Sequence, residues 1–291
     1  MISSSKRTIV SFPTLELTTM IGCPLMCNYC PQDNLRDAYG TDVKYMTLET
    51  FTLALDKIPP NTRLDFSGMA EPWVNPACTD MFELALSRGF RVAVYTTLYN
   101  WDRATTDRVA ELMVEYADQF DTFSVHYPDV NGNMKGWKYN EDWEYALHVV
   151  QGVCHHAGIR SEGMTMSDQG QVHPDLQHLG IRLWNWIGHD RAGSLPVEQV
   201  KEQPIQIAPR HTGPIRCGKT KTYDQNVLLP NGDVVLCCMD YDCKHILGNI
   251  NNNTIEEIRQ GPEFRALLLE NARNEFSTNS LCRTCTDAVP R

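Results

Sequence analysis

Three cysteines near the N-terminus have a spacing that suits a metal centre. Cys23, Cys27 and Cys30 form a CxxxCxxC pattern directly after a strand-like segment. A cubane [4Fe–4S] centre takes four thiolates, so three ligands from one loop leave one iron open to an outside ligand. A structural zinc loop usually has a second ligand pair nearby, but no Cys or His lies between Cys30 and Cys78. The pattern therefore favours an open iron–sulfur centre, with zinc as the alternative.

A second group of cysteines lies towards the C-terminus. Its members are Cys217, Cys237, Cys238, Cys243, Cys282 and Cys285. Between them, residues 226–237 are typical of a β-hairpin around Asn231 and Gly232, because this pair suits the positive φ angles of a tight turn. Four thiolates can bind either zinc or an iron–sulfur cluster, and the spacing alone does not choose between them.

The two cysteine groups carry a family resemblance. The N-terminal triplet resembles that of the radical S-adenosylmethionine (SAM) superfamily, in which the amino and carboxylate groups of SAM chelate the open iron. The C-terminal cysteines, with residues 232–238 and 247–250, resemble the SPASM family of auxiliary iron–sulfur domains in its shortened, single-cluster twitch form. The resemblance implies one [4Fe–4S] cluster that binds SAM and one auxiliary [4Fe–4S] cluster. The implied metal ligands are Cys23, Cys27 and Cys30, and Cys217, Cys237, Cys282 and Cys285.

The resemblance also implies residues around SAM. Residues 67–72 lie where the superfamily carries a GGEP-like motif, and Gly68, Glu71 and Pro72 match it while the two residues between Gly68 and Glu71 depart from it. In the family, the acidic residue accepts hydrogen bonds from the SAM ammonium group, which points to Glu71. Tyr29 resembles the family aromatic that packs near the adenine. A solvated loop glutamate is the structural alternative for Glu71.

Further candidates come from strand ends and from the second cysteine group. Thr96, Ser124 and His126 end two expected strands, so they either face the SAM ribose or the substrate or simply pack. Arg191 lies in a segment that resembles a motif of sugar-acting twitch enzymes, and we expect it to contact a substrate hydroxyl. Cys238 is a candidate hydrogen-atom donor, or a small buried apolar side chain. We list Arg191 and Cys238 as candidate catalytic residues.

Composition sets the protein class. The chain of 291 residues has a formal net charge of −10, which argues against a nucleic-acid partner, since such partners need Lys and Arg to neutralise phosphates. The N-terminus lacks the apolar region of a signal peptide, and no stretch approaches the ~18 apolar residues of a membrane span. We therefore expect a cytoplasmic protein without a membrane partner. In that reducing compartment, its 11 cysteines suggest metal ligands or catalytic thiols.

Short apolar runs alternate with segments of helical period, a pattern that predicts repeated βα units and a parallel sheet. The expected strands are residues 14–18, 63–66, 91–96, 122–126, 159–164 and 181–187. The expected helices are 48–58, 78–87, 105–117, 141–156 and 254–271, the last interrupted at Gly261 and Pro262. Six βα units make a partial (β/α)6 barrel, which is the superfamily's fold, with the site at the carboxyl ends of its strands.

The expected domain organisation follows from where this pattern stops. We expect an α/β radical SAM partial barrel over residues 1–195, a linker over 196–214, and a small α+β SPASM/twitch domain with a β-hairpin and helices over 215–291. The linker prediction rests on its Pro, Gln and Gly content without periodicity.

The resemblance implies an enzyme that cleaves SAM to a 5′-deoxyadenosyl radical, which abstracts a hydrogen atom from a substrate carbon. We expect an oxidoreductase (dehydrogenase) or an epimerase that acts on a polyhydroxylated small molecule of the sugar, cyclitol or aminoglycoside type. We expect no leader-binding domain of the kind that peptide-modifying relatives carry, because the cysteine loop begins too early in the chain to leave room for one. This expectation favours a small-molecule substrate. A peptide-modifying SPASM enzyme and a zinc-binding scaffold without catalysis are the alternatives.

An external electron donor is also implied, a flavodoxin or a ferredoxin. Because both are acidic, we expect a local positive patch near the cysteine loop, with Arg36, Lys44 and Lys219 as candidates.

Overall fold

The computed structural model describes residues 13–165, 171–181, 183, 190–195, 215–220, 223–273 and 280–290. In this part of the chain, an eight-stranded sheet has the order β5-β4-β3-β2-β1-β7-β8-β9, and β6 pairs with β10 in a second, small sheet. The strands of the large sheet are β1 (Thr14–Leu17), β2 (Arg63–Phe66), β3 (Arg91–Thr96), β4 (Phe120–Tyr127), β5 (Ser161–Thr165), β7 (Gln225–Leu228), β8 (Asp233–Val235) and β9 (Ile246–Asn249). Those of the small sheet are β6 (Ile215–Cys217) and β10 (Ala288–Pro290).

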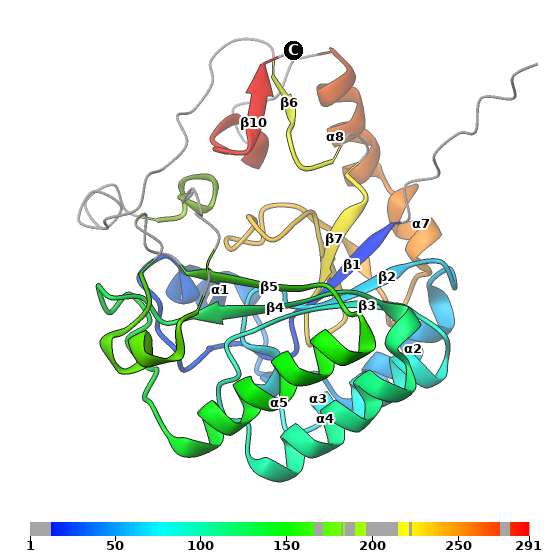
Figure 1. Ribbon diagram of the computed structural model, residues 1–291. Coiled ribbons are helices and arrows are strands. Elements are labelled where there is room, and N and C mark those ends of the chain that lie inside the picture. The colour runs from blue at the N-terminus through cyan, green and yellow to red at the C-terminus, as the bar shows by residue number, and fades with distance from the viewer. Residues whose placement is uncertain are drawn as a thin grey trace, which may run out of the picture.

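Strands β1 to β5 are parallel neighbours, as the βα pattern predicts. The helices that connect them are α1 (Gln32–Tyr39), α2 (Leu48–Lys57), α3 (Cys78–Ser87), α4 (Arg103–Glu115) and α5 (Glu141–Ala157). Figure 1 shows α2 to α5 packed together on one face of the sheet, with the C-terminal elements on the other side. The expected α/β arrangement with a parallel sheet is therefore confirmed for these five strands. Most of the sixth predicted strand (181–187) and the predicted linker (196–214) lie outside the described residues.

Helix α2 shows why the connecting helices form where the sequence places them. Thr47 caps its first turn, with the Oγ1 atom accepting a hydrogen bond from the Thr50 amide at 3.1 Å. Phe51, Ala54 and Leu55 lie on one face at helical spacing and are buried. The helix is therefore held to the sheet by an apolar stripe.

Alternation along the strands separates an apolar core from a polar concave face. On β4, Phe123 and Val125 are buried in the core that the sheet forms with the helices. Ser124 and His126 alternate with them and therefore point to the opposite side of the sheet. The same alternation places Glu16 opposite the buried Leu15 and Leu17 of β1. The side of the sheet away from the helices is therefore polar.

The C-terminal hairpin joins the same sheet. Strands β7 and β8 are antiparallel, and the turn between them contains Gly232 with a φ of +89°, as the Asn-Gly pair predicts. Strand β7 also pairs in parallel with β1, with Thr14 opposite Gln225 and Leu17 opposite Leu228. No pattern in the sequence predicted this pairing. Through the pairing of β7 with β1, the hairpin next to the second cysteine group joins the same sheet as the strand that precedes the first group.

Two short helices follow the hairpin, α7 (Ile255–Arg259) and α8 (Pro262–Arg273). The expected interruption is present, but it lies at Gln260 and Gly261, one residue earlier than predicted, because Pro262 is the first residue of α8. Thr254 and Glu257 form a reciprocal capping box at the start of α7. These helices cover β9, because Ile258 of α7 packs directly against Gly248.

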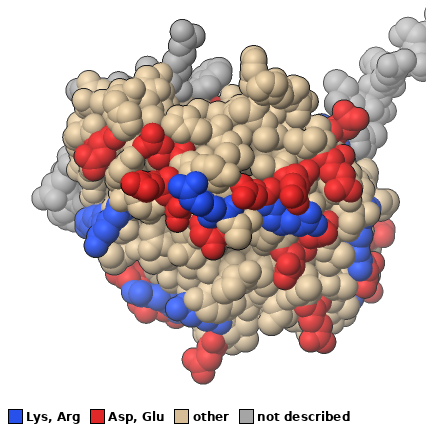
Figure 2. Space-filling view, turned by 60° about the horizontal axis from the view of Figure 1, so that its bottom comes forward, with Lys and Arg blue, Asp and Glu red and all other residues tan. Residues whose placement is uncertain are grey.

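The surface in Figure 2 carries acidic and basic side chains beside one another. Ion pairs also lie on the helices, such as those of Arg108 with Glu83 and Glu111. Exposed pairs of this kind are each worth about 0–1 kcal/mol, so they do little to hold the fold. Among the described residues, no helix is both long enough and apolar enough to span a membrane.

Candidate functional site

The N-terminal cysteine loop follows β1 and is fixed by a loop from another βα unit. The amide of Asn28 donates to the carbonyl of Asn133 at 2.9 Å, and the amide of Gly136 donates to the carbonyl of Leu25 at 2.7 Å. A Cβ atom on Gly136 would lie 2.1 Å from the Pro24 carbonyl oxygen, so only glycine permits this approach. The loop after β4 therefore sets the position of the cysteine loop at the carboxyl edge of the sheet.

Cys23, Cys27 and Cys30 line a cavity at this edge. Other predicted site residues lining it are Tyr29, Gly68, Glu71, Thr96, His126 and Arg191. They come from five different segments of the chain, which the parallel order of the strands brings to one edge.

Pro72 and Ser124 do not line this cavity. Pro72 starts a short turn, and its carbonyl accepts a hydrogen bond from the Thr19 hydroxyl at 2.7 Å. Ser124 is fully buried on the concave face of β4.

The three cysteines of the triplet are partly buried. Burial raises the pKa of Cys23 to about 12 and that of Cys27 well above its usual range. A buried thiolate is costly unless a cation compensates it, and a bound metal centre is the usual source of that charge. Three cysteines around one cavity at a strand edge therefore suit a metal centre better than three independent structural thiols.

Cys30 has two polar neighbours that the sequence did not indicate. Gln32 Nε2 lies 3.2 Å from Cys30 Sγ and also donates to the Met69 carbonyl, while its Oε1 accepts from the Cys23 amide. Tyr241 Oη lies 3.2 Å from the same sulfur. Tyr241 is 211 positions away in the sequence, so only the fold reveals it.

Glu71 is 4% exposed and is surrounded by protein donors. Its Oε1 accepts from Thr96 Oγ1 at 2.6 Å and from the Trp73 amide at 3.4 Å. Its Oε2 accepts from the Thr97 amide at 2.7 Å and from Thr97 Oγ1 at 2.8 Å. Burial raises its pKa, and these hydrogen bonds oppose the shift. The solvated loop glutamate is therefore not what the structure contains, since this carboxylate joins the loop after β2 to the end of β3.

His126 borders the cavity without a hydrogen-bond partner for Nε2 among the described residues. Burial and the positive charge of Arg191 lower its pKa to about 4. The imidazole is therefore neutral at physiological pH and has one nitrogen available at the cavity wall.

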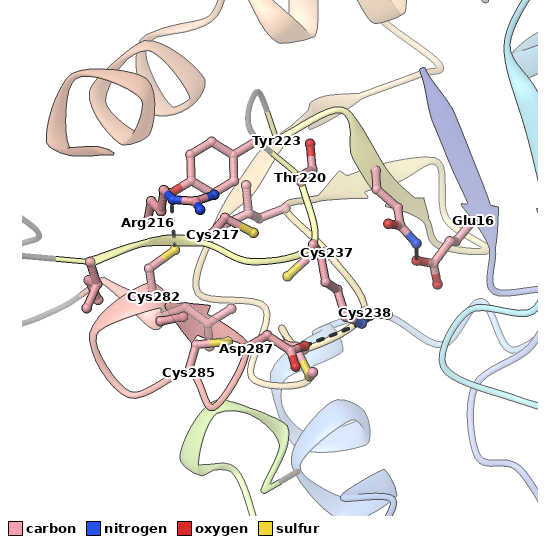
Figure 3. Close-up of a pocket in the computed structure, with 17 residues that line it drawn as sticks. Glu16, Arg216, Cys217, Thr220, Tyr223, Cys237, Cys238, Cys282, Cys285 and Asp287 are labelled. Atoms are coloured by element: carbon pink, nitrogen blue, oxygen red, sulfur yellow. Dashed lines mark hydrogen bonds and ion pairs between the residues drawn. The ribbon is translucent and has the colours of Figure 1, made fainter. Parts of the chain in front are cut away.

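A second cavity lies beside β6, β10 and the end of β8 (Figure 3). Its lining includes the four predicted auxiliary ligands and the candidate hydrogen donor: Cys217, Cys237, Cys282, Cys285 and Cys238. Figure 3 shows these cysteines around one space, although they come from three separate segments. Burial raises the pKa of Cys282 to about 11 and that of Cys285 to about 12.

Cys238 differs from the other four in its partners. Lys219 Nζ lies 3.4 Å from Cys238 Sγ and 3.5 Å from Asp287 Oδ2. Lys219 therefore faces this second cavity instead of the N-terminal cysteine loop, which removes it from the expected surface patch.

Arg36 does lie beside the cysteine loop, where it pairs with Asp33. Cys243 lines neither of the two cavities.

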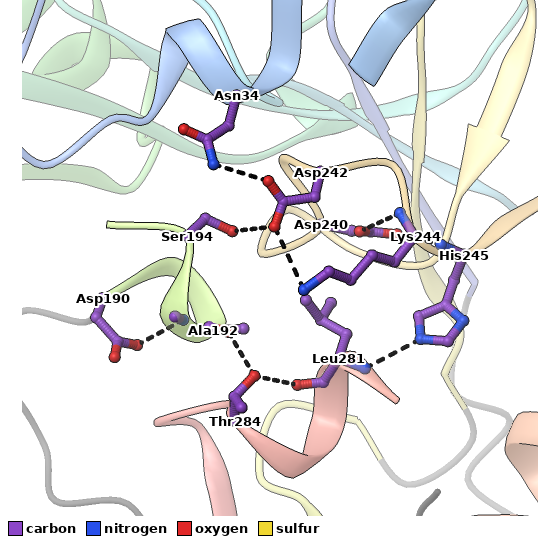
Figure 4. Close-up of polar contacts among 11 residues, drawn as sticks. Asn34, Asp190, Ala192, Ser194, Asp240, Asp242, Lys244, His245, Leu281 and Thr284 are labelled. Carbon is purple, nitrogen blue, oxygen red and sulfur yellow. Dashed lines mark hydrogen bonds and ion pairs between the residues drawn. The ribbon is translucent and has the colours of Figure 1, made fainter. Parts of the chain in front are cut away.

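Arg191 occupies a strained turn between the two cavities. Arg191 and Ala192 have φ values of 51° and 54°, a conformation that costs non-glycine residues free energy. The turn is held by Thr284, whose Oγ1 donates to the Ala192 carbonyl, and by Asp190, which accepts from the Gly193 amide (Figure 4). These contacts fix the direction of the Arg191 side chain, whose guanidinium lies over the Tyr241 ring at 5.4 Å.

The comparison with protein families concerns the second cavity. Residues 217–286, which include all four predicted auxiliary ligands, match the SPASM family model, described as an iron–sulfur cluster-binding domain. The C-terminal part of the chain is a SPASM domain. No curated protein matches the chain in sequence.

Solved structures extend the likeness to the whole chain. A structure of BtrN in complex with AdoMet and 2-DOIA superposes with a TM-score of 0.58 and 15% identity, over 94% of this chain and 92% of that one. Native anSMEcpe with bound AdoMet gives 0.54 and 12%, over 94% and 88%. Native anSMEcpe with bound AdoMet and the Cp18Cys peptide gives 0.54 and 12%, over 95% and 89%. The chain therefore shares its fold with these structures, as the resemblance to the radical SAM superfamily predicts, and the SPASM part of the resemblance is supported by the family model.

Proposed function

We propose that this protein is a radical SAM enzyme that oxidises or epimerises a polyhydroxylated small molecule. In this proposal, Cys23, Cys27 and Cys30 hold a [4Fe–4S] cluster whose open iron binds SAM. Cys217, Cys237, Cys282 and Cys285 hold the auxiliary [4Fe–4S] cluster of the SPASM domain. The observation that carries the proposal is the grouping of the cysteines, which line two cavities, the first of which Arg191 and Tyr241 also line.

The donor sets suit iron–sulfur clusters. The cysteines of both sets are partly buried, and hydrogen-bond donors lie against them, such as Gln32 at Cys30. Among the described residues, no three His, Cys, Asp or Glu side chains form a group that could hold a metal ion. A cluster of four irons and four sulfides is wider than one ion, so its ligands surround a cavity instead of meeting at a point. The cysteines of both groups have that arrangement.

When bound, the reduced cluster with SAM supplies a 5′-deoxyadenosyl radical, which takes a hydrogen atom from a substrate carbon. The task of the protein is then to position the substrate and to exclude water. We assign Tyr29, Gly68, Glu71 and Thr96 to SAM binding, with Glu71 acting through the Thr96–Thr97 strand end that it organises.

Residues on the substrate side of the cavity have separate tasks. We assign Arg191 to a substrate hydroxyl, because its turn holds the cation between the two cavities. His126, with Nε2 at the cavity wall, is placed to bind the SAM ribose or the substrate. We place Ser124 beneath it as a buried support, and Pro72 as the start of the turn that follows Glu71.

A polar substrate is favoured by the concave face of the sheet. Glu16, Asp65, Tyr95 and Ser124 lie on the side of their strands opposite the apolar core, as does His126. Such a surface suits a ligand that carries hydroxyl or amino groups. A peptide substrate is the alternative class, and the anSMEcpe structure with a bound peptide makes it a necessary comparison.

The fate of the substrate radical divides the two reactions. In oxidation, the auxiliary cluster, when bound, would accept the second electron and a base would take a hydroxyl proton, which gives a carbonyl. In epimerisation, a thiol would give a hydrogen atom to the substrate carbon and become a thiyl radical, which one electron from the external donor and one proton would restore. Cys238 is the candidate thiol, and it lines the second cavity beside Lys219. In D₂O, deuterium at a substrate carbon that is lost in Cys238→Ala supports epimerisation, whereas a carbonyl product unaffected by this change supports oxidation.

We propose the domain division that the sequence predicts, with a barrel over 1–195, a linker over 196–214 and the SPASM domain over 215–291.

We also propose a flavodoxin or ferredoxin as the electron donor. Its docking place in this proposal is the surface recess beside Cys27, which Arg36 and Lys135 border. Met26 in the same recess is 61% exposed and offers an apolar contact.

Anaerobic reconstitution tests the proposal. We expect about eight iron atoms per chain and reductive release of 5′-deoxyadenosine from SAM. A triple Cys→Ala variant at 23, 27 and 30 should keep about four irons and lose SAM cleavage, and Cys282→Ala with Cys285→Ala should lose the other four. Cys154→Ala is the matched control, because this buried helix cysteine lies in the apolar core. Colourless protein with stoichiometric zinc would refute the enzyme and support the scaffold alternative.

A further inference from the structure

Tyr241 lies where the two cysteine groups meet. It is 1% exposed and belongs to an apolar cluster against which Cys30, Cys238 and Cys243 pack. Its hydroxyl oxygen is 3.2 Å from Cys30 Sγ. The residue also lines the N-terminal cavity. It thus connects the SPASM domain directly to one sulfur of the CxxxCxxC triplet.

The direction of this hydrogen bond follows from the chemistry of a ligand thiolate. A metal-bound cysteine sulfur carries no hydrogen, so it can only accept. The tyrosine hydroxyl has one hydrogen to donate, and among the described residues Cys30 Sγ is the partner that the structure gives it. With Gln32 Nε2 also 3.2 Å from the sulfur, Cys30 accepts from two side chains.

Arg191 strengthens this donor. Its Cζ atom lies 5.4 Å from the centre of the Tyr241 ring, and its Nε donates to the Tyr29 carbonyl at 3.4 Å. A cation over the face of an aromatic ring is attracted to the ring electrons and draws density from the hydroxyl. The positive charge and the hydroxyl dipole therefore both face Cys30.

The loop that carries Tyr241 is fixed on both sides (Figure 4). Asp240 accepts hydrogen bonds from the amides of Lys244 and His245, each at 2.8 Å. Asp242 accepts from Asn34 of α1 at 2.8 Å and from Ser194, next to the Arg191 turn, at 3.0 Å. The loop is therefore tied both to the helix that follows Cys30 and to the turn that carries the cation.

We propose that Tyr241 is a positioning and tuning residue that donates to the Cys30 ligand and raises the reduction potential of the N-terminal cluster, with Arg191 as its stacked cation. Reduction adds one negative charge to a cluster, so donors and cations beside a ligand sulfur favour the reduced form. The inference rests on the proposed function, because it requires a cluster at Cys23, Cys27 and Cys30. It adds a means by which the SPASM domain acts on the SAM-binding centre through a side chain.

The test is a redox titration of the reconstituted full-length protein, followed by electron paramagnetic resonance. The N-terminal cluster is identified as the signal that changes when SAM is added. For Tyr241→Phe we expect the equilibrium constant for reduction to fall about tenfold, which equals a shift of about 59 mV to lower potential for one electron. The auxiliary signal should stay in place.

Tyr39→Phe is the matched control. Tyr39 belongs to the same apolar cluster and loses the same atom, but the structure gives it no contact with Cys30. A second probe covers the case in which Tyr241→Phe fails to fold. Replacement of Tyr241 by 3-fluorotyrosine preserves the ring and strengthens the donor, so the potential should rise.

The outcomes separate the two proposals. If the wild-type protein takes up no cluster at the triplet, the proposed function fails. If the cluster forms and Tyr241→Phe leaves its potential equal to that of Tyr39→Phe, the function stands and the role of Tyr241 is refuted. An equal shift of both clusters would also refute it, because the contact is specific to Cys30. Loss of an exchangeable proton coupling at the N-terminal cluster in Tyr241→Phe would support it.

Discussion

The hydrogen-bond network of Glu71 gives a stability prediction that does not depend on any cofactor. The buried carboxylate accepts four hydrogen bonds, from Thr96, Thr97 and Trp73. A hydrogen bond to a charged group is worth about 1.5–3 kcal/mol, and an orphaned buried donor costs about 1–3 kcal/mol. The threonine hydroxyls can rotate to other acceptors, but the Thr97 amide is fixed.

We therefore expect Glu71→Ala to lower the free energy of unfolding by about 3 kcal/mol, which includes the relief of burying a charge. Glu71→Gln should cost about 1 kcal/mol, since one amide oxygen can still accept from the Thr97 amide and hydroxyl. With an m value of about 3 kcal/mol/M, the alanine variant should unfold at about 1 M less urea.

The assay is urea unfolding of iron-free protein, followed by circular dichroism and by tryptophan fluorescence, which should coincide if the transition is cooperative. Glu111→Gln is the control, because Glu111 is an exposed helix residue in an ion pair with Arg108. A change within about 0.5 kcal/mol for Glu71→Ala, as for an ordinary surface site, would refute this reasoning.

Two further predictions concern the same edge of the sheet. Gly68 has a φ of +70°, and a Cβ there would lie 2.4 Å from Thr18 Oγ1 and 2.8 Å from the Thr18 amide nitrogen. In urea unfolding, Gly68→Ala should therefore lower the free energy of unfolding by about 2 kcal/mol more than Gly89→Ala does. Gly89 is the control, because its φ of +83° is equally unusual but its surroundings are open. Equal decreases for the two variants would contradict the steric argument. Burial and the charge of Arg191 lower the pKa of His126 to about 4 in the folded protein. As the pH falls below about 6.5, the imidazole of the unfolded chain therefore binds a proton before that of the folded chain does. The free energy of unfolding should then decrease between about pH 6.5 and 4. The decrease should amount to about 3 kcal/mol. When the free energy of unfolding is measured over this pH range, His126→Gln should abolish the decrease. If His126→Gln leaves the pH dependence unchanged, the imidazole is not shielded in this way.

The local pattern of the sequence was sufficient for most of the first half of the chain. The predicted bounds of β2, β3 and α3 coincide with the observed ones, because apolar period, caps and breakers are properties of neighbouring residues. Helix α1, directly after the cysteine loop, was not predicted. Its residues carry a low apolar content, and only contacts such as that of Gln32 with Met69 show why it is held there.

The sequence by itself predicted the chemistry that we propose, since the spacing of the N-terminal cysteines favours an open iron–sulfur centre and the family resemblance implies a second, complete set of thiolate ligands. Only the tertiary structure decided how the two sets are joined. The parallel pairing of β7 with β1 connects segments about 200 residues apart and brings Tyr241 to Cys30. The tertiary structure also shows that Glu71 is a buried hydrogen-bond acceptor and that Lys219 faces Cys238. Such contacts depend on which strands become neighbours, and that choice is made by burial of the whole core, which no local pattern contains.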